Sequence, residues 1–493
     1  MKLSRRTFLK SASVLSLGAS VGCVPVSRRK RPEFVNDVHT QLNPTYVRNV
    51  QYVDSLEAVR ETIKRAHDSG RSVSVAGGRH AAGGQQFSTD DELIDTRDLR
   101  RVLDFDREAG TIEFEAGIQW PEVLAFLQQT QQNQASAWTI AQKQTGTDRL
   151  SIGGALASNV HGRGLRLPPI ISNVDSFVLV DAEGDLHRCS RTENVDLFRL
   201  VIGGYGLFGF VYSVKLRLVP RVKVERVVAM MNAEELPEAF AGRIRDGFIY
   251  GDFQFAIDAN SDDFLRRGIL SCYVPVPAGT PATENGRRLS AEDWKSLIHL
   301  AHVAPGDAFE KYANHYLATS GQVYWSDKQY VSDYFDDYHS ELDVRLDVKE
   351  PATEVIGELY VPREALPEFL SEAREYLRTS GVTVIYGTIR LIEKDTESYL
   401  PWAKESYACV IFNLHTPHTL EGKARTADAF LCLIDMAISL NGSYYLTYHR
   451  YATRKQLEAY YPQFQEFLKL KLNYDPEECF ASDWYRHYKR AFA

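Results

Sequence analysis

The chain has 493 residues, of which 44% are hydrophobic and 25% charged, the balance of a soluble globular protein. This length is too great for one ordinary core and predicts two domains, or three. The net charge of −8 argues against nucleic acid, because phosphate binding needs a basic face. Six scattered cysteines without a CxxC pair predict neither a disulfide framework nor a zinc site. No apolar run of about 18 residues follows the N-terminal segment, so the body is not expected to span a membrane.

The N-terminal segment carries a targeting pattern. Residues 4–10, Ser-Arg-Arg-Thr-Phe-Leu-Lys, precede a small-residue and apolar stretch that runs to Gly22. The pattern resembles a bacterial twin-arginine export signal, which would carry the folded protein, with any redox cofactor already loaded, to the periplasm. Cys23 is a candidate for lipid attachment, and only that attachment would tie the protein to a membrane. Residues 1–34 are therefore set apart from the fold.

Between residues 48 and 220 short strands and helices alternate with glycine turns, which predicts an α+β domain. The first helix is expected to bury Val59, Ile63 and Ala66 on one face. The predicted elements are a helix over 56–69, strands over 72–76 and 111–116, a helix over 120–129, a hairpin of strands 177–181 and 186–189, and a strand over 211–219.

The pattern changes after about residue 225. Strands alternate there with a long helix, which predicts a second sheet with helices on one face. The predicted elements are a strand over 354–361, a helix over 364–379, strands over 382–392 and 407–414, and a helix over 427–440. The predicted divisions are a leader at 1–34, a first domain at 35–225, a second at 226–424, and a segment at 425–493 that returns to the first domain.

One glycine pattern is misleading. Gly204-Tyr-Gly206-Leu-Phe-Gly209 fits G-x-G-x-x-G, a fingerprint that holds a pyrophosphate only when a strand precedes it and a helix follows. Here the expected order is reversed, because helical residues 195–201 precede the pattern and an alternating strand follows it. The sequence therefore excludes a Rossmann-type NAD site.

Three other loops form a better ligand-binding set. They are 75–84 (Val-Ala-Gly-Gly-Arg-His-Ala-Ala-Gly-Gly), 151–162 (Ser-Ile-Gly-Gly-Ala-Leu-Ala-Ser-Asn-Val-His-Gly), and 203–209 running into Phe210-Val211. Consecutive glycines accept positive φ and let backbone N–H groups approach a pyrophosphate. The small residues of the second loop allow a planar ring to lie against the backbone.

In this order and spacing the three loops resemble the signatures of the p-cresol methylhydroxylase (PCMH)/vanillyl-alcohol oxidase family of FAD enzymes. The resemblance covers about residues 45–220, and the tail from Tyr474 to Asp483 is similar to the C-termini of the sugar-alcohol and aldonolactone oxidase branch. It implies FAD as the cofactor. It also implies a two-domain α+β fold, in which an FAD-binding domain of PCMH type carries a substrate-binding cap, a sheet covered by helices.

In that family the first loop wraps the FAD pyrophosphate and the second runs beside the flavin. A histidine placed like His80 is often bonded to the flavin 8α-methyl group, and an imidazole nitrogen is a competent nucleophile near neutral pH. The alternative is a hydrogen-bonding or structural His80, and Ala81 stands where many relatives with a linked histidine have Ser. For His161 packing and hydrogen bonding near the flavin are preferred to catalysis. The resemblance assigns cofactor binding to Gly77, Gly78, Arg79, His80, Ala81, Ser151, Gly153, Gly154, Ser158, Asn159, His161, Gly162, Gly209 and Val211.

The predicted strand at 382–392 is the best candidate for the substrate side. Tyr386, Thr388 and Arg390 project to one face of it. Alditol oxidases carry a Glu-x-Arg pair at the corresponding place, so Arg390 matches while Thr388 replaces the Glu. Arg390 would stabilise negative charge on the flavin or the substrate; the alternative is a plain salt bridge with a carboxylate such as Glu358.

Two histidines are further catalytic candidates. His415 shares a strand face with Asn413, and His449 lies in the Tyr-rich segment 444–450; each could instead be a satisfied core histidine. The charged residues 393–395 (Glu-Lys-Asp) are expected in a solvated loop. No metal-ligand set is predicted.

The sequence thus predicts an FAD-dependent oxidoreductase that transfers hydride from a C–OH group to flavin N5. The substrate would be a sugar, alditol, aldonolactone or related alcohol, and electrons would pass on to dioxygen or a carrier. Two alternatives remain open: the same fold acting on an aromatic or amine substrate, and an electron-transfer flavoprotein without a small-molecule substrate of its own. The twin-arginine export machinery is an expected partner.

Overall fold

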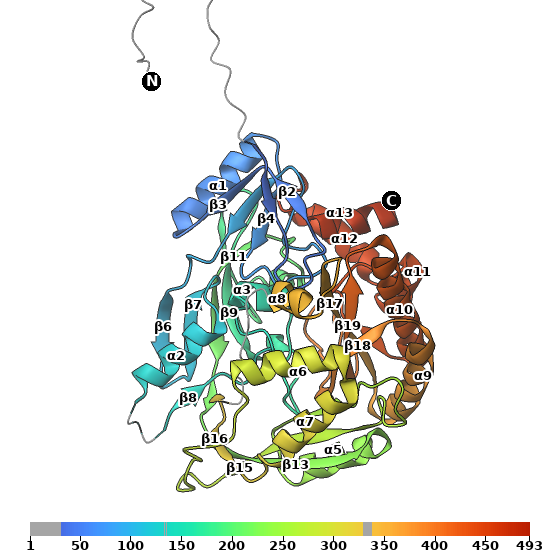
Figure 1. Cartoon of the computed structure of the whole chain (residues 1–493). Helices are drawn as coiled ribbons and strands as arrows, with labels where there is room; N and C mark the ends of the chain where they lie inside the picture. The colour runs from blue at the N-terminus through green and yellow to red at the C-terminus, as the bar shows by residue number, and fades with distance from the viewer. Residues whose placement is uncertain (1–30, 133, 135, 329–337) are drawn as a thin grey trace, which may run out of the picture. The chain divides into compact units, whose positions relative to one another are not determined.

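The computed structural model describes residues 31–132, 134, 136–328 and 338–493 (Figure 1). The twin-arginine motif and Cys23 lie outside these residues, so the export signal and the lipid anchor stay predictions. Within the described part of the chain, no helix combines the length and the apolar character needed to cross a membrane.

Two sheets organise the first half of the chain. A parallel sheet has the strand order β3-β5-β4, and an antiparallel sheet has the order β10-β9-β11-β7-β6. Their strands are β3 (Asn49–Tyr52), β4 (Val73–Ala76), β5 (Glu92–Asp95), β6 (Val102–Asp106), β7 (Thr111–Glu115), β9 (Val174–Val180), β10 (Leu186–Ser190) and β11 (Phe210–Arg217). The accompanying helices are α1 (Leu56–Asp68), α2 (Trp120–Thr130), α3 (Ile152–Ser158) and α4 (Val195–Val201). The strands and helices predicted in this region are thereby confirmed.

Helix α1 shows why the local prediction succeeded. Ser55 caps it, accepting a hydrogen bond from the amide of Ala58 at 3.3 Å, and a cap of this kind stabilises a helix by about 1 kcal/mol. Val59, Ile63 and Ala66 are buried on one face, as their spacing predicts. Because α4 precedes the Gly204–Gly209 pattern and β11 follows it, the exclusion of a Rossmann site is also confirmed.

The second half of the chain is built on an eight-stranded antiparallel sheet with the order β16-β13-β15-β14-β18-β19-β17-β20. Its strands are β13 (Lys223–Asn232), β14 (Tyr250–Phe255), β15 (Arg267–Val276), β16 (Val323–Trp325), β17 (Ala352–Pro362), β18 (Thr383–Ile392), β19 (Tyr407–Pro417) and β20 (Ser443–Tyr444). Two small sheets complete the fold: β1 (Glu33–Val35) with β2 (Thr45–Val47), and β8 (Trp138–Thr139) with β12 (Val219–Pro220).

Helices cover both faces of the eight-stranded sheet, and the expectation of helices on one face is wrong. On one face, Gly357 of β17 lies against Phe430 of α10, so closely that a Cβ at Gly357 would be 2.1 Å from the ring. On the opposite face, Glu354 of the same strand contacts His302 of α6. The helices of this half are α5 (Leu236–Arg245), α6 (Ala291–Val303), α7 (Pro305–Leu317), α8 (Tyr338–Arg345), α9 (Leu366–Thr379) and α10 (Leu420–Ser439). Sequence periodicity shows that a strand is buried, but not what covers each side.

The last helices run back to the parallel sheet of the first half (Figure 1). Phe480 forms a bridge with Val73 of β4, and the amide of Asp483 donates to the carbonyl of Phe87 at 2.7 Å. These helices are α11 (Arg454–Tyr460), α12 (Phe464–Tyr474) and α13 (Asp483–Phe492). The C-terminal segment therefore holds the strand from which the first glycine loop emerges.

Candidate active site

A cavity lies where the three glycine-rich loops meet one face of the eight-stranded sheet. It encloses about 1210 Å³, part of it open to solvent. Ile356 of β17, together with Thr447 and Tyr448 from the segment after β20, forms its far wall. Of the residues predicted to bind the cofactor, those that line the cavity are Gly77, Gly78, Arg79, His80, Ala81, Ser151, Gly153, Gly154, Ser158, Gly209 and Val211.

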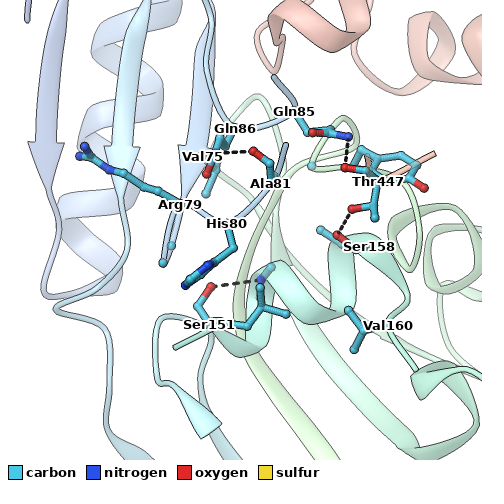
Figure 2. A pocket seen from close by; sticks show the side chains of 18 of the residues that line it. Val75, Arg79, His80, Ala81, Gln85, Gln86, Ser151, Ser158, Val160 and Thr447 are labelled. Carbon is cyan, nitrogen blue, oxygen red and sulfur yellow. Dashed lines mark hydrogen bonds between the residues drawn. The ribbon is translucent and has the colours of Figure 1, made fainter. Parts of the chain in front are cut away.

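The first loop packs tightly on the second. A Cβ at Gly77 would lie 1.9 Å from Oγ of Ser151, and a Cβ at Gly78 would lie 2.2 Å from the carbonyl oxygen of Arg149, so only glycine fits at both positions. The Arg79 side chain points away from His80 (Figure 2) and pairs with the buried Asp95 of β5 at 3.0 Å. Arg79 therefore fixes the loop on the parallel sheet.

The histidine of this loop is electrically neutral near pH 7. Burial, and next the neighbouring His39, lower the pKa of His80 to about 3. A neutral imidazole retains a nitrogen lone pair, the property that a nucleophile needs.

The second loop forms a short helix beside the cavity. Ser151 caps α3, its Oγ accepting from the amide of Gly154 at 3.3 Å (Figure 2). At the other end, Ser158 Oγ accepts from Thr447 Oγ1 at 3.2 Å, while Gln85 Nε2 donates to the Thr447 carbonyl at 2.9 Å. The C-terminal segment is thus hydrogen-bonded to both glycine loops across the cavity.

The lining fits FAD, a long ligand held largely by backbone groups. A Cβ at Gly206, which lines the cavity, would meet no atom within 4 Å, so the space beside this glycine can hold a ligand. His39 also lines the cavity, and its buried Nε2 has no hydrogen-bond partner among the described residues. A buried polar atom of this kind requires a partner, which FAD, rich in acceptors, can provide.

Asn159, His161 and Gly162 do not line the cavity but fix the loop behind it. Asn159 ends α3 with φ of 51° and donates through Nδ2 to Asp395 Oδ2 at 2.9 Å. The amide of Gly162 donates to Gln142 Oε1 at 3.1 Å. The expectation that residue 395 lies in a solvated loop is wrong: Asp395 is only 4% exposed, because it anchors Asn159.

His161 forms a buried ion pair with Glu358 of β17. Its Nδ1 lies 3.0 Å from the carbonyl oxygen of Gly162 and its Nε2 lies 2.9 Å from Glu358 Oε2. Because both neighbours are acceptors, both ring nitrogens must donate, and the imidazole is cationic. Tyr360 and Tyr448 also donate to Glu358, each at 2.6 Å. Burial opposes ionisation of Glu358, but His161 and these hydroxyls outweigh it and lower its pKa to about 2.

Arg390 of β18 is buried and is not paired with Glu358. It is 6% exposed, and its Nε has no hydrogen-bond partner among the described residues. Its strand neighbour is Cys409 of β19, and directly opposed residues project to the same face, the face that carries Glu358. The structure thus leaves Arg390 a buried cation with a spare donor, which suits the role of stabilising negative charge.

The two candidate histidines lie in different surroundings. His415 of β19 is directly opposite Glu354 and is next to His302 of α6. His449 is half-buried and stacks on Tyr451 at 5.1 Å, and desolvation of its ring lowers its pKa to about 4. Among the described residues that line the cavity, none is Arg390, His415 or His449, so their catalytic roles stay predictions.

Sequence reasoning missed the roles of Glu354, Glu358 and Tyr448 in the buried polar networks. A signal was present, because strand 352–362 is otherwise largely apolar and places two acids four residues apart, on one face. Buried acids in such a strand need partners. The partners, His161 and His302, are too distant in sequence for spacing to identify.

The comparisons with known proteins match two separate parts of the chain. Residues 47–190 match a family model described as an FAD binding domain, and residues 308–488 match one described as D-arabinono-1,4-lactone oxidase. The chain is 31% identical over 186 residues to an uncharacterized oxidoreductase of the fasciation locus of Rhodococcoides fascians, covering 38% of this chain and 40% of that protein.

Two further relatives are named for sugar lactones. L-galactono-1,4-lactone dehydrogenase 1, mitochondrial, of Oryza sativa subsp. japonica is 31% identical over 186 residues, which cover 37% of this chain and 30% of that protein. L-gulonolactone oxidase of Mus musculus is 26% identical over 167 residues, covering 34% and 36%. The matched region thus spans only 30% to 40% of the length of these relatives. The fold and cofactor predictions are confirmed: the chain contains an FAD-binding domain of PCMH type, uses FAD, and is similar in its C-terminal part to D-arabinono-1,4-lactone oxidase.

Proposed function

We propose that the protein is an FAD-dependent oxidoreductase that oxidises a C–OH group of a sugar-derived lactone or a related alcohol. The observation that carries the proposal is the cavity in which the three glycine loops meet one face of the eight-stranded sheet. The first two loops lie within the match to the FAD binding domain, and the sheet strand that forms the far wall lies within the match to D-arabinono-1,4-lactone oxidase. When bound, FAD supplies the acceptor for a hydride leaving the C–OH carbon. Dioxygen or an electron carrier would then take the electrons.

The residues of the chain would divide binding and orientation between them. The glycine loops would hold the pyrophosphate and the flavin through backbone N–H groups. Tyr448 lines the cavity, and its hydroxyl donates a hydrogen bond to the ionised Glu358. This bond fixes the orientation of the Tyr448 side chain in the cavity wall. Arg390 would stabilise negative charge that develops on the substrate oxygen or on the flavin.

His80 would attach the flavin covalently. Its imidazole is neutral and lines the cavity, so a ring nitrogen has the protonation state for bond formation with the 8α-methyl carbon. That step would break one methyl C–H bond and the imidazole N–H bond. The electron pair and both protons would pass to the flavin ring, and the dioxygen or carrier named above would reoxidise it. Ser151 of the second loop lies beside His80 (Figure 2), because Gly77 and Gly78 let the first and second loops pack closely. This attachment is the finer part of the proposal and is tested separately from the presence of FAD.

The proposal includes export of the folded protein to the periplasm by the twin-arginine pathway. It rests on the motif at residues 4–10 and on the cofactor, which would be loaded before transport. Replacing Arg5 and Arg6 by lysine should leave flavin-loaded protein in the cytoplasm of the producing bacterium. Unchanged export of the variant would overturn this part.

The first experiment is a visible spectrum of the native protein, repeated on the acid-denatured pellet. Flavin colour that stays in the wild-type pellet and leaves the His80→Ala pellet would support both FAD and the link. Colour that leaves both pellets would remove the covalent link only. Native protein without flavin would overturn the proposed function.

The second experiment is anaerobic titration of the flavoprotein with L-galactono-1,4-lactone, L-gulono-1,4-lactone and D-arabinono-1,4-lactone. Bleaching of the flavin bands by one of these lactones or by a related sugar alcohol supports the proposal. Bleaching only by aromatic alcohols or amines, or by no small molecule, would overturn the substrate class. Reoxidation of the bleached protein in air then distinguishes an oxidase from a dehydrogenase.

A further inference from the structure

A second polar cluster lies on the same sheet face as the Glu358 network, between the sheet and helix α6. Glu354 of β17 and His415 of β19 are directly opposite each other in the sheet. His302 reaches them from α6, and His339 of α8 lies 3.0 Å from the other carboxylate oxygen, Oε2. The side chains of Glu354, His302 and His339 are each 5% exposed. Neither the cavity lining nor the proposed mechanism uses this cluster.

The donor atoms of three of these residues form a compact triangle. His302 Nε2 lies 3.3 Å from Glu354 Oε1 and 3.3 Å from His415 Nδ1, and His415 Nδ1 lies 3.8 Å from the same carboxylate oxygen. With metal–ligand bonds of about 2.0–2.2 Å, two corners of a tetrahedron are roughly 3.3–3.6 Å apart. An octahedral ion with bonds of about 2.1 Å would need roughly 3.0 Å. Two edges of the triangle match one face of a tetrahedral site, and the third, at 3.8 Å, is slightly longer.

One carboxylate oxygen of the triangle, Glu354 Oε1, is left without a hydrogen bond from the described residues. His302 Nδ1 lies 2.8 Å from the carbonyl oxygen of Ile298, so Nδ1 carries a proton and Nε2 is the ring atom that faces the triangle. It faces Glu354 Oε1, which is buried and has no hydrogen-bond partner among the described residues. A buried carboxylate oxygen of this kind needs a positive partner, either a proton on His302 Nε2 or a metal ion that His302 and His415 bind with it. A backbone carbonyl behind a ligating histidine is also the usual outer support of a metal ligand.

The carboxylate is held in place from its other side. Tyr338 donates to Glu354 Oε2 at 2.5 Å, which leaves Oε1 to face the two imidazoles. The neighbouring residue Thr353 donates to the carbonyl of Thr40 at 2.7 Å. Thr40 follows His39, which lines the flavin cavity. The cluster is thus structurally connected to one wall of the cavity.

We propose that His302, Glu354 and His415 bind a divalent transition-metal ion of the zinc type. Two imidazoles and one carboxylate are the donor set of many zinc sites, whereas magnesium and calcium prefer oxygen ligands alone. The ion clamps α6 to β17 and β19 beside the flavin cavity. This inference goes beyond the proposed function and does not depend on it, because the ligands are outside the cavity.

The test is zinc binding by the flavin-loaded protein after treatment with a chelator and removal of the chelator. Equilibrium dialysis against buffered Zn²⁺, with metal analysis, should give one ion per chain. Glu354→Gln, His302→Gln and His415→Gln should each weaken binding by more than about 100-fold, beyond the loss expected from disturbing an outer-shell group. His299→Gln is the matched control, since His299 lies on the same helix and outside the triangle, and should bind as wild type does.

A second measurement needs no variant and therefore does not depend on whether a buried substitution folds. Co²⁺ added to the stripped wild-type protein should give the intense visible bands of tetrahedral cobalt, at wavelengths longer than the flavin bands, and Zn²⁺ should abolish them. Absence of stoichiometric Zn²⁺ binding, or equal affinity in His299→Gln and the three ligand variants, would overturn the proposal. In that case a shared proton occupies the triangle.

Discussion

Two buried glutamates on one strand, Glu354 and Glu358, differ in the hydrogen-bond partners of their carboxylate oxygens. They lie four residues apart on one face of β17, both are buried, and each is close to a histidine. Glu358 has a partner for each oxygen: Tyr448 on Oε1, and His161 and Tyr360 on Oε2. Glu354 has Tyr338 on Oε2 and no hydrogen-bond partner on Oε1 among the described residues.

This difference shows that residue types and the distances between their ligand atoms do not by themselves define a metal site. His161, Glu358 and Cys409 are as close together as His302, Glu354 and His415. Around Glu358 the hydrogen bonds are complete, and burial raises the pKa of the Cys409 thiol well above its usual range, which disfavours the thiolate that binds metal. The first group is therefore a structural ion pair, whereas the second has a carboxylate oxygen left open for the proposed ion. The hydrogen-bond inventory separates them.

The largest expected effect is on stability, from Glu358→Gln. The substituted amide would present a neutral group to the cationic His161, leaving a buried charge without its counterion. Breaking a buried pair from one side costs about 3–5 kcal/mol. Denaturant unfolding at pH 7, followed by far-ultraviolet circular dichroism, measures the loss.

Glu354→Gln is the matched control, and its stability is compared with that of the wild type in metal-free protein. It should cost less than Glu358→Gln, because Tyr338 can still donate to the amide oxygen and Oε1 of Glu354 accepts no hydrogen bond from the described residues. Equal losses for the two variants would contradict the distinction between a completed ion pair and an incomplete site.

The second prediction concerns acid. The folded-state pKa of Glu358 is about 2, below its ordinary value of 4.5, so ionised Glu358 stabilises the fold at every pH above about 4.5. That contribution is lost as the pH falls through about 2. The shift corresponds to about 3 kcal/mol. The stability difference between wild type and Glu358→Gln should therefore narrow by about that amount between pH 5 and pH 2. A difference that stays constant over this range would show that Glu358 titrates normally.

Sequence reasoning succeeded for features set by nearby residues and failed for contacts between distant parts of the chain. Helix α1, the hairpin of β9 and β10, and the glycine loops were predictable, because caps, periodicity and turn residues act within a few residues of each other. Even so, α10 begins at Leu420, seven residues before the predicted start, where Thr419 caps it through the amide of Gly422 at 3.0 Å. The partners of Glu354 and Glu358 could not be predicted. They come from other strands and helices, and only the fold brings them into contact.

The third prediction separates the two glutamates by their response to metal. Zn²⁺ at 100 times its dissociation constant should stabilise the wild-type protein by about 2.7 kcal/mol, since an ion that binds only the folded state shifts the equilibrium by mass action. Thermal unfolding of the chelator-treated protein, with and without Zn²⁺, measures this. Glu358→Gln should start from a lower midpoint but keep the response, whereas Glu354→Gln should lose it. A response lost in both variants, or kept in both, would remove the distinction.

The smallest expected effect comes from Tyr448→Phe, and it tests whether the completed ion pair also serves the cavity. The change removes a hydroxyl that donates to Glu358 Oε1 at 2.6 Å. A hydrogen bond to a charged acceptor contributes about 1.5–3 kcal/mol to stability, so the free energy of unfolding should fall by about 1.5 kcal/mol. Tyr360→Phe is the matched control, because Tyr360 donates to the same carboxylate at 2.6 Å but is not among the described residues that line the cavity. Both variants should lose similar stability, but only Tyr448→Phe should shift the flavin absorption bands. Equal spectra in the two variants would show that the hydroxyl of Tyr448 holds the fold together without contributing to the surroundings of the flavin.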